Sequence, residues 1–244
     1  MIAVLSPTSI DGHSIIFRKW LTKQISWDDL FEYKSLTPEM RDLIQSAIDA
    51  RASILVAGGT NSGKTTIANR IVELIRPEER VVSVEKIHKF QFDHPRSVTL
   101  ESEGNISVEF KDLLTTGAKM RPDWLVIGEL YGAETLHAMQ LMGNGHNAIS
   151  ITHATSAEDA LSRLETLCLM ANLGLGLDDI RQIVASALNL ILYQELLPKG
   201  SRKTIQMVEL RGIKDGRYIL QPLMRYNTET ETFEMTGTKP SWEK

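Results

Sequence analysis

Continuous apolar runs alternate with amphipathic segments through the middle of the chain. The runs SILVA, RVVSV, WLVIG and NAISITHA are rich in Val, Ile and Leu, as is typical of strands that are buried on both faces. Between them, TTIANRIVELI, FKDLLTTGAKM and GAETLHAMQLM repeat apolar residues at helical spacing. This alternation predicts an α/β fold, in which helices cover a mostly parallel sheet.

Different patterns flank this region. Two short apolar runs, IAVL and SIIFRKW, enclose a turn and predict a strand pair near the start of the sequence. A short helix is expected at Trp27–Tyr33, and Thr37 followed by Pro38 predicts the start of a longer one. After the last predicted strand, apolar positions at helical spacing predict a helix that reaches Ile191. From Thr204 onward, the pattern predicts a small antiparallel meander.

A glycine-rich loop lies between the run SILVA and the helix that follows it. Its sequence GGTNSGKTT matches the pattern G-x-x-x-x-G-K-[ST]. The glycines let successive backbone N–H groups turn towards phosphate oxygens, and the helix N-terminus adds its positive end. Lys64 is expected to reach the β- and γ-phosphates, and Thr65 to bind Mg²⁺. We therefore predict an ATP or GTP site formed by Gly58, Gly59, Thr60, Asn61, Ser62, Gly63, Lys64, Thr65 and Thr66.

Three polar residues end predicted strands. Glu85 follows RVVSV, Glu129 follows WLVIG, and His153 follows NAISIT. Because ligands of open parallel sheets lie beyond the carboxyl ends of the strands, these side chains should converge on the phosphates held by the loop. A carboxylate there can bind Mg²⁺ through water or accept a proton from the attacking water, and a histidine can contact the γ-phosphate.

Composition narrows the choice of partners. The 27 basic and 31 acidic residues give a net charge of −4, which disfavours a nucleic-acid motor because no global basic field is present. No stretch approaches the ~20 apolar residues that a membrane span needs. Cys168, the single cysteine, lies at helical spacing with leucines and is interpreted as a core residue of a protein in a reducing compartment. His146 and His153 have no further Cys, His or acidic residue at the spacing of a zinc site, so we do not predict zinc binding.

Two longer segments carry a family resemblance. RPDWLVIGELYGAETLHAM, followed by GNGHNAISITHATSAEDALSRLETL, resembles the core of the ATPases of type II and type IV secretion, conjugation and pilus assembly. Within that superfamily the sequence most resembles the branch that drives Tad (Flp) pili. The likeness runs from the turn at residues 9–12 to Arg202. It implies a RecA-like P-loop NTPase domain, with ATP as the nucleotide.

The resemblance also implies roles for the residues at the strand ends. Residues 58–65 correspond to the Walker A loop, Glu85 to the surviving acid of the Asp box, and Gly128-Glu129 to an atypical Walker B end. Gly145-His146 and Thr152-His153-Ala154 form the His box. The catalytic set we expect is Lys64 on phosphate, Glu129 with Thr65 at Mg²⁺ or water, Glu85 as general base, His153 as γ-phosphate sensor, and Arg121 as charge partner.

The same resemblance implies an assembly and a place in the cell. Six copies would form a ring, with ATP between neighbours, against inner-membrane platform proteins of a secretion or pilus machine at the cytoplasmic face of the membrane. Residues 1–36 would be a remnant of the family's N-terminal domain with a linker. Residues 37–244 would form the C-terminal ATPase domain, with residues 204–244 as an antiparallel extension.

The sequence departs from the family pattern near the active site. Lys86 and Lys89 replace acids of the Asp box, and Tyr131 replaces an arginine two residues after the Walker B glutamate. The segment 101–107 has no arginine, although the family usually places one there to serve the nucleotide. Since arginine neutralises charge in phosphoryl transfer, these changes bear on hydrolysis more than on binding. Two hypotheses follow: an ATP-hydrolysing motor, or a nucleotide-binding regulatory or assembly subunit with weak or lost hydrolysis.

Overall fold

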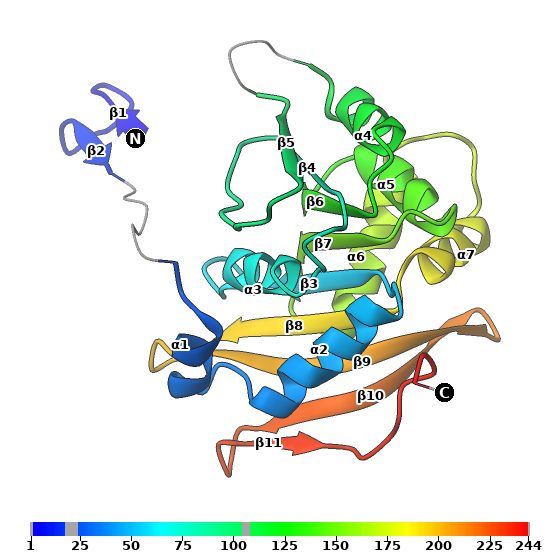
Figure 1. Ribbon diagram of the computed structural model, residues 1–244. Helices are drawn as coiled ribbons and strands as arrows, with labels where there is room; N and C mark the ends of the chain where they lie inside the picture. Colours follow the sequence, from blue (N-terminus) through cyan, green and yellow to red (C-terminus); the bar gives the residue numbers. More distant parts are fainter. Residues whose placement is uncertain (1, 18–23, 104–107, 244) are drawn as a thin grey trace.

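The main sheet has nine strands in the order β11-β10-β9-β8-β3-β7-β6-β4-β5. The computed structural model (Figure 1) describes residues 2–17, 24–103 and 108–243. The six strands of this sheet that come first in the chain, β3 to β8, are parallel to one another. The last three, β9 to β11, extend the sheet in antiparallel fashion. The strands are β3 (Ile54–Gly58), β4 (Val81–Glu85), β5 (Ser97–Glu101), β6 (Trp124–Leu130), β7 (Ala148–His153), β8 (Leu190–Leu196), β9 (Arg202–Lys214), β10 (Arg217–Asn227) and β11 (Thr232–Met235).

Helices cover both faces of this sheet. Along β3, Ile54 and Val56 pack with α1, α2 and α3, whereas Leu55 and Ala57 pack with α4 to α7. The two core clusters therefore lie on opposite sides of one sheet, which confirms the predicted α/β fold. The helices are α1 (Trp27–Glu32), α2 (Pro38–Asp49), α3 (Lys64–Val72), α4 (Phe110–Lys119), α5 (Glu134–Gly143), α6 (Ala157–Leu169) and α7 (Leu177–Ala187).

The segment before the main sheet contains the predicted strand pair. Strands β1 (Ile2–Val4) and β2 (Ser14–Ile16) form a separate antiparallel pair. Residues 18–20, which belong to the predicted run SIIFRKW, lie outside the described residues. Helix α1 and Leu36 contribute to the same core cluster as α2. A domain boundary after residue 36 stays a prediction.

The structure corrects three details of the predicted elements. Helix α7 ends at Ala187, and Ile191 lies in strand β8, beside β3. A fully buried strand is apolar at every position, so part of it matches a helical pattern too. The short edge strand β5 was not predicted. Its side chains alternate between exposed and half-buried, so it has no continuous apolar run. The C-terminal meander begins at Arg202 and continues the main sheet through β8.

Candidate nucleotide-binding site

The glycine-rich loop joins the buried strand β3 to the start of α3, as the motif requires. Gly58 has a φ of +156°, and a Cβ atom there would lie 2.3 Å from the carbonyl oxygen of Gln194 and 2.6 Å from Ser62 Oγ. Gly63, the residue before α3, has a φ of +98°. Side chains other than hydrogen would clash at the first position and be strained at the second. The two glycines thus set the path of the loop.

The interior of this loop suits an anion. Ser62 Oγ is buried and has no hydrogen-bond partner among the described residues. Lys64 is only 7% exposed, and its Nζ donates a hydrogen bond to the carbonyl oxygen of Gly59 at 2.6 Å. Burial lowers the pKa of Lys64, while the charge of Glu129 opposes that shift. A buried hydroxyl, a buried ammonium and the N-terminus of α3 together form a donor set that fits phosphate.

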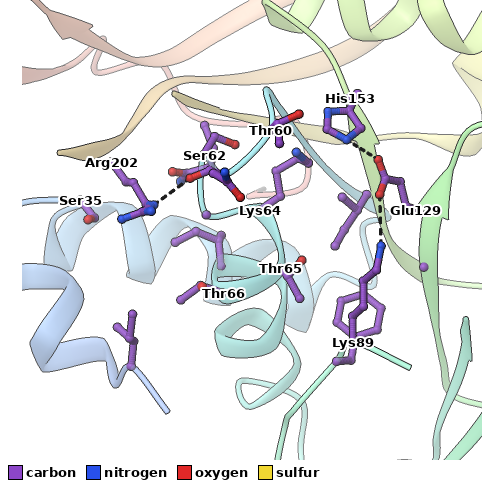
Figure 2. A pocket seen from close by; sticks show the side chains of 18 of the residues that line it. Ser35, Thr60, Ser62, Lys64, Thr65, Thr66, Lys89, Glu129, His153 and Arg202 are labelled. Carbon is purple, nitrogen blue, oxygen red and sulfur yellow. Dashed lines mark hydrogen bonds and ion pairs between the residues drawn. The ribbon is translucent and has the colours of Figure 1, made fainter. Parts of the chain in front are cut away.

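A cavity of about 820 Å³ opens in front of the loop. Its lining includes Ile25, Leu30, Tyr33 and the segment 199–202, and residues at or just after the carboxyl ends of β4, β6 and β7. Figure 2 shows Arg202 at one end of the cavity, and Lys89, Glu129 and His153 at the other. Residues 60–66 form the wall between these ends. The volume lies in the range of small-molecule sites, which typically occupy ≈ 300–1,000 Å³. The cavity is therefore large enough for a nucleoside triphosphate.

At one end of the cavity, Glu129 faces two basic side chains. Its Oε1 atom lies 2.6 Å from Nε2 of His153, and its Oε2 atom lies 3.7 Å from Nζ of Lys89. Figure 2 shows the two contacts on the two sides of the carboxylate. Burial, followed by the charges of the surrounding cations, lowers the pKa of His153 despite the opposing charge of Glu129. A neutral imidazole can thus donate its Nε2–H to the carboxylate.

A local irregularity of β6 accompanies the position of Glu129. The register between β6 and β7 shifts between Ile127 and Glu129, so Gly128 lies at a bulge. A Cβ atom at Gly128 would lie 3.2 Å from Cα of Glu85, which means that β4 passes close to this residue. Glu129 consequently lines the cavity although it stands inside the strand rather than after it.

Glu85 also reaches this end of the cavity, but its carboxylate is engaged by the chain itself. It is 2% exposed, and its Oε2 atom accepts hydrogen bonds from the backbone N–H groups of Lys89 at 2.7 Å and Phe90 at 2.9 Å. Its Oε1 atom lies 2.9 Å from Nδ1 of His88. In this conformation Glu85 holds the loop that follows β4. Its role as general base stays a prediction.

The structure brings Lys64, Glu85, Glu129 and His153 to the lining of one cavity, together with Thr65. A hydroxyl and a carboxylate are the oxygen ligands that Mg²⁺ prefers, so Thr65 and Glu129 fit a Mg²⁺ site. Arg121 is not among the described residues of this lining. It is exposed and lies just before the amino end of β6, whereas the cavity lies at the carboxyl ends of the strands.

Sequence reasoning gave no role to Arg202, the first residue of β9. Its Nε atom donates a hydrogen bond to the carbonyl oxygen of Asn61 at 2.8 Å, and its Cδ atom would lie 3.3 Å from a Cβ atom at Gly63. Arg202 thus supports the outer side of the glycine-rich loop. It belongs to no motif, and only the fold brings it to a partner that lies 141 positions away in the sequence.

Comparisons with known proteins agree with this architecture. The family model described as "Type II/IV secretion system protein" matches residues 3–235. The chain is 30% identical over 218 residues to the conjugal transfer protein TrbB of Rhizobium radiobacter, covering 88% of this chain and 65% of that protein. It is 32% identical to an uncharacterized protein of Methanocaldococcus jannaschii, covering 86% of this chain and 78% of the relative.

A solved structure shares the fold. The VirB11 ATPase of the Brucella suis type IV secretion system, solved in complex with sulphate, matches with a TM-score of 0.64 and 23% identity. The match covers 78% of this chain and 66% of that one. The chain spans about two thirds of the length of the conjugal transfer relatives, at 65% and 66%. Among the described residues, no helix is long and apolar enough to cross a membrane.

Proposed function

Because the chain belongs to the type II/IV secretion system protein family, we propose that it binds ATP with Mg²⁺ and hydrolyses it as a motor subunit. The machine that it powers would be a secretion or pilus-assembly system, and we assign it to the Tad-type branch on the motifs of residues 121–167. The hydrolysis reaction would convert ATP and water into ADP and phosphate.

One observation carries this proposal. The glycine-rich loop and the Glu129–His153 pair line the same cavity. The loop supplies donors for phosphate, and the pair supplies a carboxylate that can act on water. A site for phosphate alone would need only the first feature. The combination of a phosphate cradle and an oriented carboxylate fits phosphoryl transfer to water.

Each residue then has a task at this site. Lys64 would bind the β- and γ-phosphates, and Thr65 would bind Mg²⁺ with Glu129 in or near the metal shell. His153 would hold Glu129 through its Nε2–H, and a contact with the γ-phosphate would require this N–H to turn from the carboxylate to a phosphate oxygen. Bound Mg²⁺ would supply charge neutralisation of the phosphates. With one oxygen held by His153, the carboxylate of Glu129 is preorganised to orient the attacking water.

We further propose that six copies form a ring that completes the site. Among the described residues of the cavity lining, Arg202 is the single arginine, and its Nε already donates to the loop backbone. A neighbouring copy could supply further positive charge, as arginine does in related phosphoryl transfer. Arg121, which is exposed, is available for such a contact. The ring would work at the cytoplasmic side of the membrane against inner-membrane platform proteins.

A measurement of nucleotide binding is the first test of the proposal. We expect the wild-type chain to bind ATP with Mg²⁺ in titration calorimetry, and Lys64→Ala to abolish tight binding because the buried ammonium is lost. Thermal unfolding of both proteins would show whether the variant keeps its fold. Light scattering with an ATP analogue would report assembly, and a wild-type chain that stays monomeric at high concentration would argue against the ring.

A second function is favoured by a specific contact. The Oε2 atom of Glu129 lies 3.7 Å from Nζ of Lys89, so the carboxylate that should act on water has a cation beside it. A regulatory or assembly subunit that binds ATP and changes shape with little turnover would tolerate this arrangement. Release of phosphate under steady-state conditions separates the two functions, because the regulatory subunit would bind ATP and release little or no phosphate.

A further inference from the structure

The loop after β4 is anchored on several sides, so it presents Lys89 in a defined place. Besides the two bonds that Glu85 accepts, the backbone N–H of His88 donates to Oε1 of Glu101 at 2.9 Å. The backbone N–H of Gln91 donates to Oδ1 of Asn69 on α3 at 3.1 Å. Phe90, which lies between these bonds, is 3% exposed in the core. The backbone of Lys89 is therefore fixed between β4, β5 and α3.

The other lysine of this loop is committed elsewhere. Nζ of Lys86 lies 3.1 Å from Oε1 of Glu134 and 3.9 Å from the ring centroid of Tyr131. An ion pair and a cation–π contact on the same ammonium hold it against the start of α5. Lys86 thus balances the charge of Glu134 and faces a residue of the β6–α5 connection. It has no comparable contact with Glu129.

Lys89 has a looser contact. Its side chain is 44% exposed, and its Nζ atom is 3.7 Å from Glu129 Oε2, which is long for a charged hydrogen bond. A partly exposed pair at this distance contributes little to stability. The ammonium can thus change position by rotation about the bonds of its four-carbon side chain, while the backbone of Lys89 stays anchored. It lies at the end of the cavity where Glu129 and His153 stand.

A terminal phosphate placed at this end would meet the negative charge of Glu129. We propose that Lys89 is a triphosphate-selecting residue, whose ammonium lies between the Glu129 carboxylate and the γ-phosphate and binds both. This role rests on the proposed function, because it requires a nucleotide on the glycine-rich loop. A diphosphate has no group at that position, so Lys89 would contribute to binding of ATP and not of ADP.

The test compares two nucleotides on one variant. Calorimetry with Mg²⁺ would measure the affinities of wild type and Lys89→Gln for ADP and for the non-hydrolysable imido analogue of ATP. We expect the variant to bind the analogue roughly 10-fold more weakly, as for one partly exposed charged contact, and to bind ADP as wild type does. Lys89→Arg should retain the preference because it keeps the charge.

Lys111→Gln is the matched control, since this exposed lysine lies on α4 outside the cavity lining. Both of its affinities should equal those of wild type. Equal losses for ADP and the analogue in Lys89→Gln, or no loss for either, would overturn the role of Lys89. A wild-type chain that binds neither nucleotide would instead reject the proposed function, and this role with it.

Discussion

The imidazole of His153 and the carboxylate of Glu129 lie 2.6 Å apart, joining the ends of two neighbouring strands. Glu129 stands after the bulge of β6, and His153 is the last residue of β7. The pair is partly exposed, with 35% of the His153 side chain and 22% of the Glu129 side chain accessible. Both groups can therefore contact a ligand in the cavity without leaving each other.

Titration of His153 should report this environment. Its pKa is lowered from the ordinary value of 6.5, by burial first and by the charges of Lys64, Arg163 and Lys89 after it. We expect NMR titration to give a pKa below 6.5 in the wild-type protein. Lys89→Gln removes one of those charges and should raise this pKa, whereas Glu129→Gln removes the opposing charge and should lower it further. Shifts in the reverse directions would contradict the arrangement.

Stability should depend on pH through the same residue. Since the fold disfavours the protonated imidazole, the unfolded chain binds more protons between the lowered pKa and about 6.5. The contribution of His153 is therefore complete above about pH 6.5 and is lost as the pH falls through that window. Urea unfolding of wild type and His153→Asn at pH 7.5 and 5.5 checks this. An equal pH dependence in both proteins would be the contrary result.

Substitutions of Glu85 and of Glu129 should differ in their effect on the free energy of unfolding. Glu85→Gln leaves one oxygen for the two backbone N–H groups but removes its negative charge, so the charge-assisted bonds weaken and we expect a loss of about 1–3 kcal/mol in the free energy of unfolding. Glu129→Gln, at a partly exposed site, should change that free energy by less than ~1 kcal/mol. Chemical denaturation measures both. If Glu85→Gln keeps wild-type stability and loses hydrolysis, the general-base role predicted from the sequence is favoured.

The contact of Lys86 with Tyr131 should be measurable as a coupling energy. Tyr131 is 43% exposed and offers the face of its ring to the ammonium at 3.9 Å. A double-mutant cycle with Lys86→Met and Tyr131→Leu should give about 0.5–1 kcal/mol of coupling in unfolding free energy. Tyr131→Phe, which keeps the ring, is the matched control and should retain most of it. Additive single effects would mean that the ring and the ammonium do not interact.

Patterns along the chain predicted the fold and the location of the candidate site well. The run SILVA, the loop and the helix after it predicted a strand–loop–helix element, which the structure contains. The order of strand ends predicted that Glu85, Glu129 and His153 meet at one sheet edge, and all three line the same cavity. These are local features, or consequences of parallel topology, which a sequence expresses directly.

Other features depend on contacts between distant segments. The engagement of Glu85 results from the way the next five residues fold back onto its carboxylate, and residue types alone do not reveal that path. Arg202 meets the glycine-rich loop only because β9 is added to the sheet beside β8. The position of Ile191 in a strand depends on its burial between β3 and β9, which overrides a helical pattern.

Steady-state release of phosphate from ATP with Mg²⁺, compared between wild type and Glu129→Gln, tests the central claim most directly. Calorimetry on the same samples would show that both proteins bind the nucleotide. We predict that Glu129→Gln releases phosphate ~10²- to 10⁴-fold more slowly than wild type, because it lacks the carboxylate that we propose acts on water. Release no faster than that of Lys64→Ala, from a wild-type protein that binds ATP, would contradict an ATPase motor.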